Sequence, residues 1–221
     1  MQPLLLGRQG PYMEVNKKSS LLVFARWTIW LLMATALASL AQLAVFGVPE
    51  INDVVLFALG YFWQLLVLAA AVGVSVWLYK ANDAAHSRDG KPMRFNPGLA
   101  AVSLWIPLLN LILPYLVVRE LWRGASVGEA DEVAVPLHVH MWGGLWIVVW
   151  LLWGVAELTV FLQREVGVPG LARLSFVSAL AFSITYIAVA ILTAIIVSTI
   201  TAALLKGQDK ASGGGNAVGS H

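Results

Sequence analysis

Few residues in this 221-residue chain have the type and spacing needed for chemistry. The closest histidine pair is His138 and His140, in the segment PLHVHMW. Side chains two residues apart point the same way on an extended segment but about 200° apart on a helix, so the pair could hold a metal ion jointly only while extended. No third histidine and no carboxylate stands at ligand spacing. We therefore interpret both as interfacial histidines, and we predict no metal site and no cofactor.

Glu157 is the one acidic residue inside a long apolar run, a position where an ionisable side chain suggests function in a membrane protein. Arg164 follows seven residues later on the same helix face, so an ion pair is favoured over a proton relay. The chain has no cysteine, which excludes disulfides and thiol nucleophiles. It also lacks the short motifs of serine hydrolases, zinc proteases and nucleotide-binding proteins. The sequence leans against an enzyme without deciding the matter.

The composition sets the environment in which any such residue must act. Apolar residues make up 59% of the chain and charged residues 12%, against about 45–50% and about 25% in ordinary soluble domains. A chain of this length cannot bury that excess in a globular core, so we predict an all-α integral membrane protein. The net charge of +2 and the absence of a basic run argue against nucleic acid as a partner.

The apolar residues fall into runs that exceed the roughly 20 residues needed to cross a bilayer. We predict transmembrane helices at four of them, 21–47, 54–79, 139–161 and 174–205. The polar stretch before the first helix and the Gly/Ser-rich stretch after the last are typical of unstructured termini. We therefore predict a flexible N-terminal arm, a single helical membrane domain and a disordered tail, at residues 1–20, 21–205 and 206–221.

A fifth apolar run, 105–124, has the sequence WIPLLNLILPYLVVRELWRG and is interrupted by two prolines. Pro107 and Pro114 cannot donate a hydrogen bond, so they free the carbonyls of Ser103 and Asn110. Freed carbonyls survive at membrane depth only inside protein or beside water, and we expect the Asn110 side-chain amide to satisfy them. We predict a Pro-broken re-entrant or interfacial hairpin that enters and leaves on one side. The alternative is a kinked fifth span.

The positions of lysine and arginine separate these two topologies, because cations are enriched in cytoplasmic loops. If the fifth run spans, four of the 14 cationic residues lie outside, namely Arg119, Arg123, Lys206 and Lys210. If it re-enters, only two lie outside, Arg164 and Arg173. The tally therefore favours four spans, a re-entrant hairpin and a cytoplasmic N-terminus.

The segment 77–126 reads WLYKANDAAHSRDGKPMRFNPGLAAVSLWIPLLNLILPYLVVRELWRGAS. It resembles the bacterial membrane proteins grouped as the domain of unknown function family 4328. Their pattern has a Trp-Leu-Tyr-Arg helix end followed by Asn, a loop closing on Phe-x-Pro-Gly, a Trp-Phe-Ile-Pro-x-x-Asn-Leu-x-x-Pro-Tyr stretch and a final Arg-Glu-Leu-Trp. The matching residues are Trp77, Leu78, Tyr79, Asn82, Phe95, Pro97, Gly98, Trp105, Ile106, Pro107, Asn110, Leu111, Pro114, Tyr115, Arg119, Glu120, Leu121 and Trp122.

The chain departs from this pattern at two charged positions. Lys80 stands where an arginine is usual, which keeps the charge and loses bidentate pairing. Leu113 stands where a basic residue often precedes the second proline, so a full basic cluster around the hairpin is not expected. The resemblance implies a multi-pass protein of the bacterial inner membrane, and it brings no reaction with it.

The residues after Pro114 have the pattern of an interfacial helix, with Tyr115, Val118 and Trp122 recurring at helical spacing. Arg119, Glu120 and Arg123 occupy its polar side, where arginine can pair with lipid phosphate. From the hairpin we predict a lipid- or ligand-binding surface made of Trp105, Asn110, Tyr115, Arg119, Glu120, Trp122 and Arg123.

The function that these features favour is a non-enzymatic accessory or scaffold protein that binds membrane lipids or a protein partner. The alternatives are a transporter or channel for a small solute and a lipid-modifying membrane enzyme. In the last helix, small residues recur every four positions, a pattern that lets helices approach closely and points to a protein partner or a homo-oligomer. These small residues are Ala190, Ala194, Ser198 and Ala202.

Overall fold

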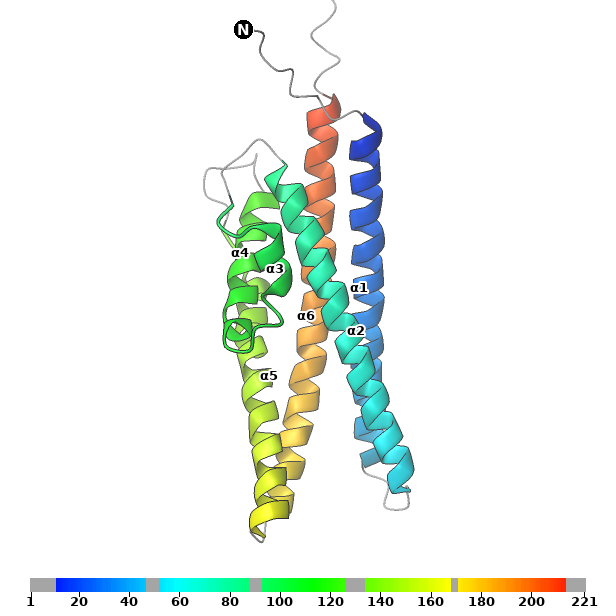
Figure 1. Ribbon diagram of the computed structural model, residues 1–221, viewed down its shortest axis with the longest axis vertical. Helices are drawn as coiled ribbons and strands as arrows, with labels where there is room; N and C mark the ends of the chain where they lie inside the picture. Colours follow the sequence, from blue (N-terminus) through cyan, green and yellow to red (C-terminus); the bar gives the residue numbers. More distant parts are fainter. Residues whose placement is uncertain (1–10, 47–51, 88–92, 126–133, 168–170, 214–221) are drawn as a thin grey trace, which may run out of the picture.

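The computed structural model describes residues 11–46, 52–87, 93–125, 134–167 and 171–213. Within these residues the chain is helical and contains no strand (Figure 1). Its helical elements are α1 Pro11–Phe46, α2 Asp53–His86, α3 Pro97–Val102, the 3-10 turn η1 Leu109–Leu111, α4 Leu113–Ala125, α5 Leu137–Phe161, the π-helical turn η2 Leu162–Val166 and α6 Leu171–Gly213.

Four of these helices are long and apolar enough to cross a membrane, which confirms the prediction of a four-helix multi-pass protein. Their apolar segments are Lys18–Val45, Val54–His86, Leu137–Phe161 and Arg173–Gly207. The fifth apolar run forms no such helix. The α3 helix just before it has 6 residues and the α4 helix in its second half has 13, both shorter than the roughly 20 residues of a span.

The long helices pack as neighbours in the order α2, α1, α6 and α5. The residues 97–125, which we call the α3–α4 unit, lie beside one half of this bundle and contact α2, α5 and α6 (Figure 1). The first residue of α1 and the last residue of α6 lie at the same end of the bundle as the α3–α4 unit. We call this the α3–α4 end, and the other the opposite end.

The helices start and stop at different residues from those that the sequence predicts. α1 begins at Pro11, inside the predicted arm, because proline is well tolerated at the first helical position. α2 continues to His86, since the alanines after Lys80 are strong helix formers. α6 continues to Gly213, where a run of three glycines begins. Residues 1–10 and 214–221 lie outside the described residues, so the arm and tail stay predictions there.

The α3–α4 unit begins at a capped helix start. The Asn96 side chain accepts a hydrogen bond from the Leu99 N–H at 2.7 Å, and Pro97 occupies the first turn, where its missing N–H costs nothing. On the inner side, side chains of α4 and α2 bury together. Val117 and Leu121 of α4 and Trp77 of α2 are at most 1% exposed, so the unit is packed into the protein core.

Buried tryptophans tie the long helices together through their ring N–H groups, which need a partner away from water. Trp77 Nε1 donates to Thr201 Oγ1 at 3.0 Å, joining α2 to α6. Trp142 Nε1 donates to Thr193 Oγ1 at 2.8 Å, joining α5 to α6. These bonds fix the helices against which the α3–α4 unit rests.

The small residues of α6 divide between the interior and the surface. Ala190 and Ala194 are buried in a cluster with Leu32 and Ala36 of α1, so they serve packing within the chain. Ser198 and Ala202 are exposed. A partner or homo-oligomer contact through this helix stays a prediction, with the exposed pair as its remaining small-residue surface.

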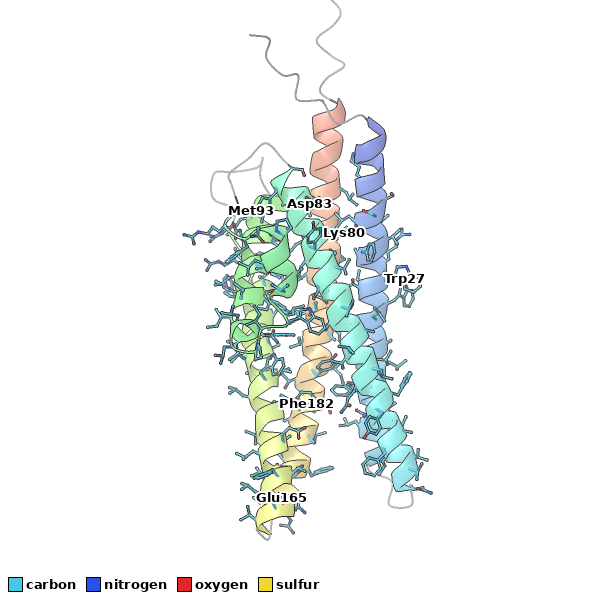
Figure 2. The ribbon with its side chains drawn as sticks, viewed as in Figure 1. Trp27, Lys80, Asp83, Met93, Glu165 and Phe182 are labelled. Atoms are coloured by element: carbon cyan, nitrogen blue, oxygen red, sulfur yellow. The ribbon has the colours of Figure 1, made fainter. Side chains whose placement is uncertain are left out.

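The outer surface of the long helices is apolar, as a bilayer requires. Trp27 and Trp30 on α1 are 65% and 70% exposed, and Figure 2 shows Trp27 projecting away from the bundle. Leu65 on α2 and Leu151 on α5 are exposed in the same way. Apolar surface on this scale is rare on soluble monomers and marks contact with lipid or protein.

Candidate functional site

The α4 helix separates apolar from charged residues along its length. Val117, Val118 and Leu121 are buried, whereas Arg119 is half-buried and Arg123 is exposed. This is the amphipathic pattern that the sequence predicts after Pro114. The two arginine side chains therefore lie toward the outer side of the α3–α4 unit.

The break between α3 and α4 exposes a series of large apolar side chains, which we call the apolar tip. Leu108 is the most exposed of them, at 83%. Trp105 is half-exposed, and its Nε1 donates to Ser75 Oγ of α2 at 2.9 Å, which anchors the start of the break. The members of the apolar tip are Trp105, Ile106, Leu108, Leu109 and Ile112.

The backbone of the break satisfies several of its own polar groups. The Trp105 N–H donates to the Val102 carbonyl at 2.9 Å, and the Asn110 N–H donates to the Ile106 carbonyl at 2.7 Å. The Ile112 N–H donates to the Leu109 carbonyl at 3.1 Å. Irregular backbone of this kind meets the requirement for polar groups at membrane depth, where no water is at hand.

The expectation that the Asn110 amide satisfies both released carbonyls is wrong for the one that Pro114 releases. The carbonyl that Pro114 releases accepts a 2.7 Å hydrogen bond from Trp146 Nε1 of α5, so the donor is a tryptophan and not the Asn110 amide. The Asn110 side chain is buried, and its Oδ1 has no hydrogen-bond partner within the described part of the chain. The donor lies 36 residues away in sequence, beyond what local reasoning about the prolines can reach.

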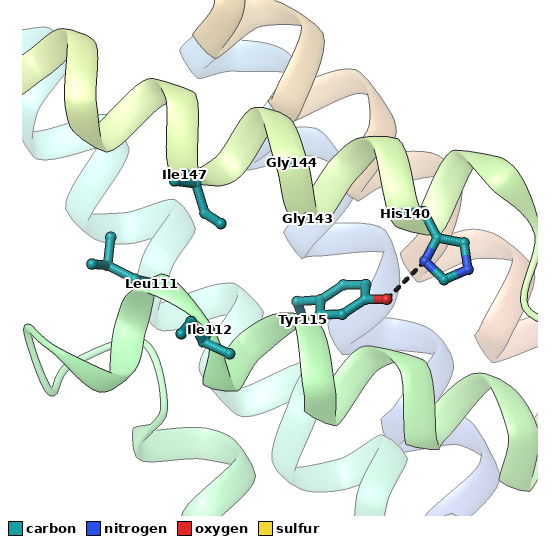
Figure 3. Close-up of a pocket in the computed structure, with 7 residues that line it drawn as sticks. All are labelled: Leu111, Ile112, Tyr115, His140, Gly143, Gly144 and Ile147. Atoms are coloured by element: carbon teal, nitrogen blue, oxygen red, sulfur yellow. Dashed lines mark hydrogen bonds between the residues drawn. The ribbon is translucent and has the colours of Figure 1, made fainter.

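Tyr115 lies against α5 at the start of α4. Its hydroxyl and His140 Nδ1 are 2.7 Å apart, a hydrogen bond whose direction follows the imidazole tautomer (Figure 3). A Cβ at Gly143 would lie 2.5 Å from Tyr115 Cδ2, so this close approach of the ring requires glycine. The Arg119 guanidinium lies 5.9 Å from the Tyr115 ring centroid, within cation–π range.

Beside Tyr115 the surface between α4 and α5 is hollowed. The hollow has a volume of about 150 Å³. Figure 3 shows its polar end at the Tyr115–His140 pair and its apolar end at Leu111 and Ile147. Its lining residues are Leu111, Ile112, Tyr115, His140, Gly143, Gly144 and Ile147.

The two histidines contact different aromatic residues. α5 begins at Leu137, so His138 and His140 are both helical, and the extended geometry needed for a shared metal ion is not met. His140 contacts Tyr115, whereas the His138 ring lies edge-on to Trp122, with ring centroids 5.4 Å apart. His138 Nε2 is buried without a hydrogen-bond partner in the described residues.

Glu120 closes the inner side of α4 against the segment that precedes α3. Its Oε1 accepts a hydrogen bond from the Arg94 N–H, while its Oε2 is buried without a partner among the described residues. Glu120 therefore holds the unit together, and it leaves Arg119 and Arg123 as the outward charges of α4.

Some residues of this region are not part of the predicted lipid- or ligand-binding surface. Asn82 of α2 is 0% exposed, and both of its amide atoms lack partners in the described part of the chain. Gly143 and Trp146 lie in the predicted helix 139–161, and the sequence predicts no contact of either residue with the broken run. The adjacent glycines 143 and 144 were the available clue, because glycine inside a helix often marks a close approach.

Glu157 lies far from these residues. It is exposed near the end of α5, at the opposite end from the two histidines. The Arg164 side chain is outside the described residues, so the predicted ion pair stays a prediction. Glu157 and the histidines are therefore not parts of one site.

Comparison with models of known sequence families identifies one family that matches the chain. The model of the domain of unknown function family DUF4328 matches residues 45–202, more than half of the sequence. The chain belongs to this family. The match spans α2, the α3–α4 unit, α5 and most of α6, so the DUF4328 region contains every residue of the candidate site. Searches of curated proteins and of solved structures find no similar chain.

Proposed function

We propose that this DUF4328 protein is a non-enzymatic accessory of the bacterial inner membrane that binds anionic phospholipid through the α3–α4 unit. The supporting observation is the fit of α4 to one leaflet. Arg123 lies ten residues beyond Leu113, roughly 15 Å along the helix at 1.5 Å per residue. This equals half of a hydrocarbon core about 30 Å thick, so an apolar tip at the bilayer centre puts Arg123 among the headgroups.

The unit enters and leaves the bilayer on one side in this proposal. The apolar tip supports it, because an exposed Leu108 beside Ile112 is stable in lipid and unfavourable in water. The donation from Trp146 to the Asn110 carbonyl also supports it, since lipid offers no substitute donor.

The same proposal gives the orientation. Lys80 and Met93 lie at the α3–α4 end, and Glu165 lies at the opposite end (Figure 2). Arg94, Arg119 and Arg123 also belong to the α3–α4 unit and to the segment that leads into it. Because cations are enriched on the cytoplasmic side, the α3–α4 end and the N-terminus are cytoplasmic.

The test compares two charge-removing variants in lipid. The double variant Arg119→Gln/Arg123→Gln is purified from vesicles with equal phosphatidylglycerol and phosphatidylcholine, and the retained lipids are quantified by mass spectrometry. Each cation at an anionic surface contributes about 1 kcal/mol, so selectivity for phosphatidylglycerol falls by up to roughly thirtyfold. The control is Arg173→Gln, at an exposed cation of the opposite end. Unchanged selectivity in the double variant would reject the proposal.

Transport of a small solute and lipid-modifying chemistry remain the alternative predictions. Neither gains a supporting contact from the described residues. The buried hydroxyls of Thr28, Thr35 and Ser39 donate to carbonyls of their own helix, which is the usual arrangement in a packed membrane helix.

A further inference from the structure

The hollow between α4 and α5 is open to the protein surface and is apolar over most of its length. Its volume of about 150 Å³ exceeds the roughly 10–15 Å³ that one water needs and is similar to that of an enclosed cavity that accepts a benzene-sized group. Ile112 and Ile147 form its walls at one end, and both are partly exposed at the outer surface of the protein.

The two adjacent glycines of α5 differ in what surrounds them. Tyr115 fills the space above Gly143, whereas a Cβ at Gly144 would meet no atom within 4 Å. Glycine inside a helix costs up to about 1 kcal/mol relative to alanine. Contact with Tyr115 accounts for the glycine at 143. No contact among the described residues requires one at 144, yet this glycine is what keeps the hollow open.

The hollow also has a direction. Its polar end is the Tyr115–His140 pair, with the Arg119 guanidinium against the Tyr115 ring. Ile147 lies seven residues beyond His140, roughly 10 Å further along α5, and marks the apolar end (Figure 3). The polar end faces the start of α5 and the apolar end faces the middle of the helix, so the hollow runs from the α3–α4 end into the bundle.

From these observations we infer that the hollow binds a segment of one acyl chain of an anionic phospholipid, with the lipid phosphate at Arg119 and His140. This inference rests on the proposed function and deepens it, because it replaces a general lipid-binding surface by a defined binding site for one lipid molecule. A phospholipid fits by charge complementarity at the cationic end and by the apolar walls at the other. It also reaches the hollow directly from the surrounding bilayer.

The experiment fills the hollow without touching the charges. Gly144→Leu places a side chain in the open space, and Gly154→Leu is the matched control, because a Cβ at Gly154 also meets nothing within 4 Å and Gly154 lies later on the same helix. Each full-length variant is extracted from phosphatidylglycerol-containing vesicles, and native mass spectrometry counts the phospholipids that stay bound. Wild type and Gly154→Leu should retain one, and Gly144→Leu should lose it.

A second measurement covers the case in which Gly144→Leu fails to fold. Wild-type protein is photolysed in vesicles that contain phosphatidylglycerol with a diazirine part-way along one acyl chain. Crosslinks should map to the peptides that contain Ile112 and Ile147. Crosslinks spread evenly over the exposed apolar residues, such as Trp27 and Leu65, would overturn the inference.

The outcomes separate this inference from the proposed function. If Gly144→Leu retains the lipid as wild type does, the inference that the hollow binds the lipid is wrong, whatever the charge variants show. If Gly144→Leu loses the lipid while Arg119→Gln/Arg123→Gln leaves headgroup selectivity unchanged, the hollow binds a chain and the anionic-lipid function is wrong. Loss of the bound lipid in Gly144→Leu, together with loss of headgroup selectivity in Arg119→Gln/Arg123→Gln, supports both the inference and the proposed function.

Discussion

The ring N–H of Trp146 donates a 2.7 Å hydrogen bond to the backbone carbonyl of Asn110, the carbonyl that Pro114 leaves without a helical donor. One side chain of α5 thus stabilises the point at which the α3–α4 unit turns. Gly143, one turn earlier on α5, admits Tyr115 and positions the start of α4. The unit therefore depends on α5 at two contacts.

Trp146→Phe removes this donor while keeping an aromatic ring. A buried acceptor left unsatisfied costs about 1–3 kcal/mol, so thermal unfolding in detergent should occur at a lower temperature than in wild type. Trp153→Phe is the control, because Trp153 lies on the same helix and is half-exposed. Equal shifts in the two variants would show that the bond to Asn110 contributes nothing specific.

Alanine substitutions at the two glycines should change stability in opposite directions. Gly143→Ala forces Tyr115 to move, and overpacking of this kind costs about 1–3 kcal/mol. Gly144→Ala meets open space and gains helix propensity of up to about 1 kcal/mol. Denaturant titration of both variants measures whether the free energy of unfolding falls or rises relative to wild type. A loss of stability at both positions would contradict the arrangement in Figure 3.

A charge in the apolar tip should distinguish lipid from water around it. Leu108→Lys puts an ammonium at the most exposed residue of the break, and a lysine at the bilayer centre costs about 2.5–3.5 kcal/mol on insertion scales. The amount of folded protein in membranes should fall strongly. Leu137→Lys is the control, at an exposed residue in the first turn of α5. Normal yield of Leu108→Lys would place the tip outside the hydrocarbon.

Single cysteines can test the orientation on this cysteine-free chain. Ala134 and Glu165 are exposed on either side of α5. We expect Ala134→Cys to react with an impermeant maleimide in inverted vesicles and Glu165→Cys to react in intact spheroplasts. The reverse labelling pattern would show that the protein has the opposite orientation in the membrane. Reaction of both residues on one side would contradict a single crossing by α5.

The sequence predicts the long helices well because a bilayer demands length and apolarity, which are local properties. The runs at 139–161 and 174–205 appear in the structure as α5, which begins at Leu137, and α6, which continues to Gly213. The prolines likewise indicate that the run 105–124 cannot form one continuous helix, since their effect on the backbone is local.

What the sequence does not reveal is the set of contacts between segments. The roles of Trp146 and Gly143 depend on how α5 packs against the break, and apart from the two adjacent glycines nothing near them in the sequence indicates this packing. His138 and His140 are the same residue type and only two residues apart, yet in the structure His138 contacts Trp122 and His140 contacts Tyr115. The predicted helix ends differ from those in the structure for a related reason. The helices continue into polar segments that hydropathy alone assigns to loops.

The order of these contacts along the chain has a consequence for biogenesis. Asn110 is synthesised 36 residues before Trp146, the residue that supplies the donor for its carbonyl. During that interval the released carbonyl lacks its donor, so the unit cannot rest at its final depth among lipids. We therefore expect α3 and α4 to reach their final arrangement only once α5 is in place, because α5 carries the donor for the released carbonyl.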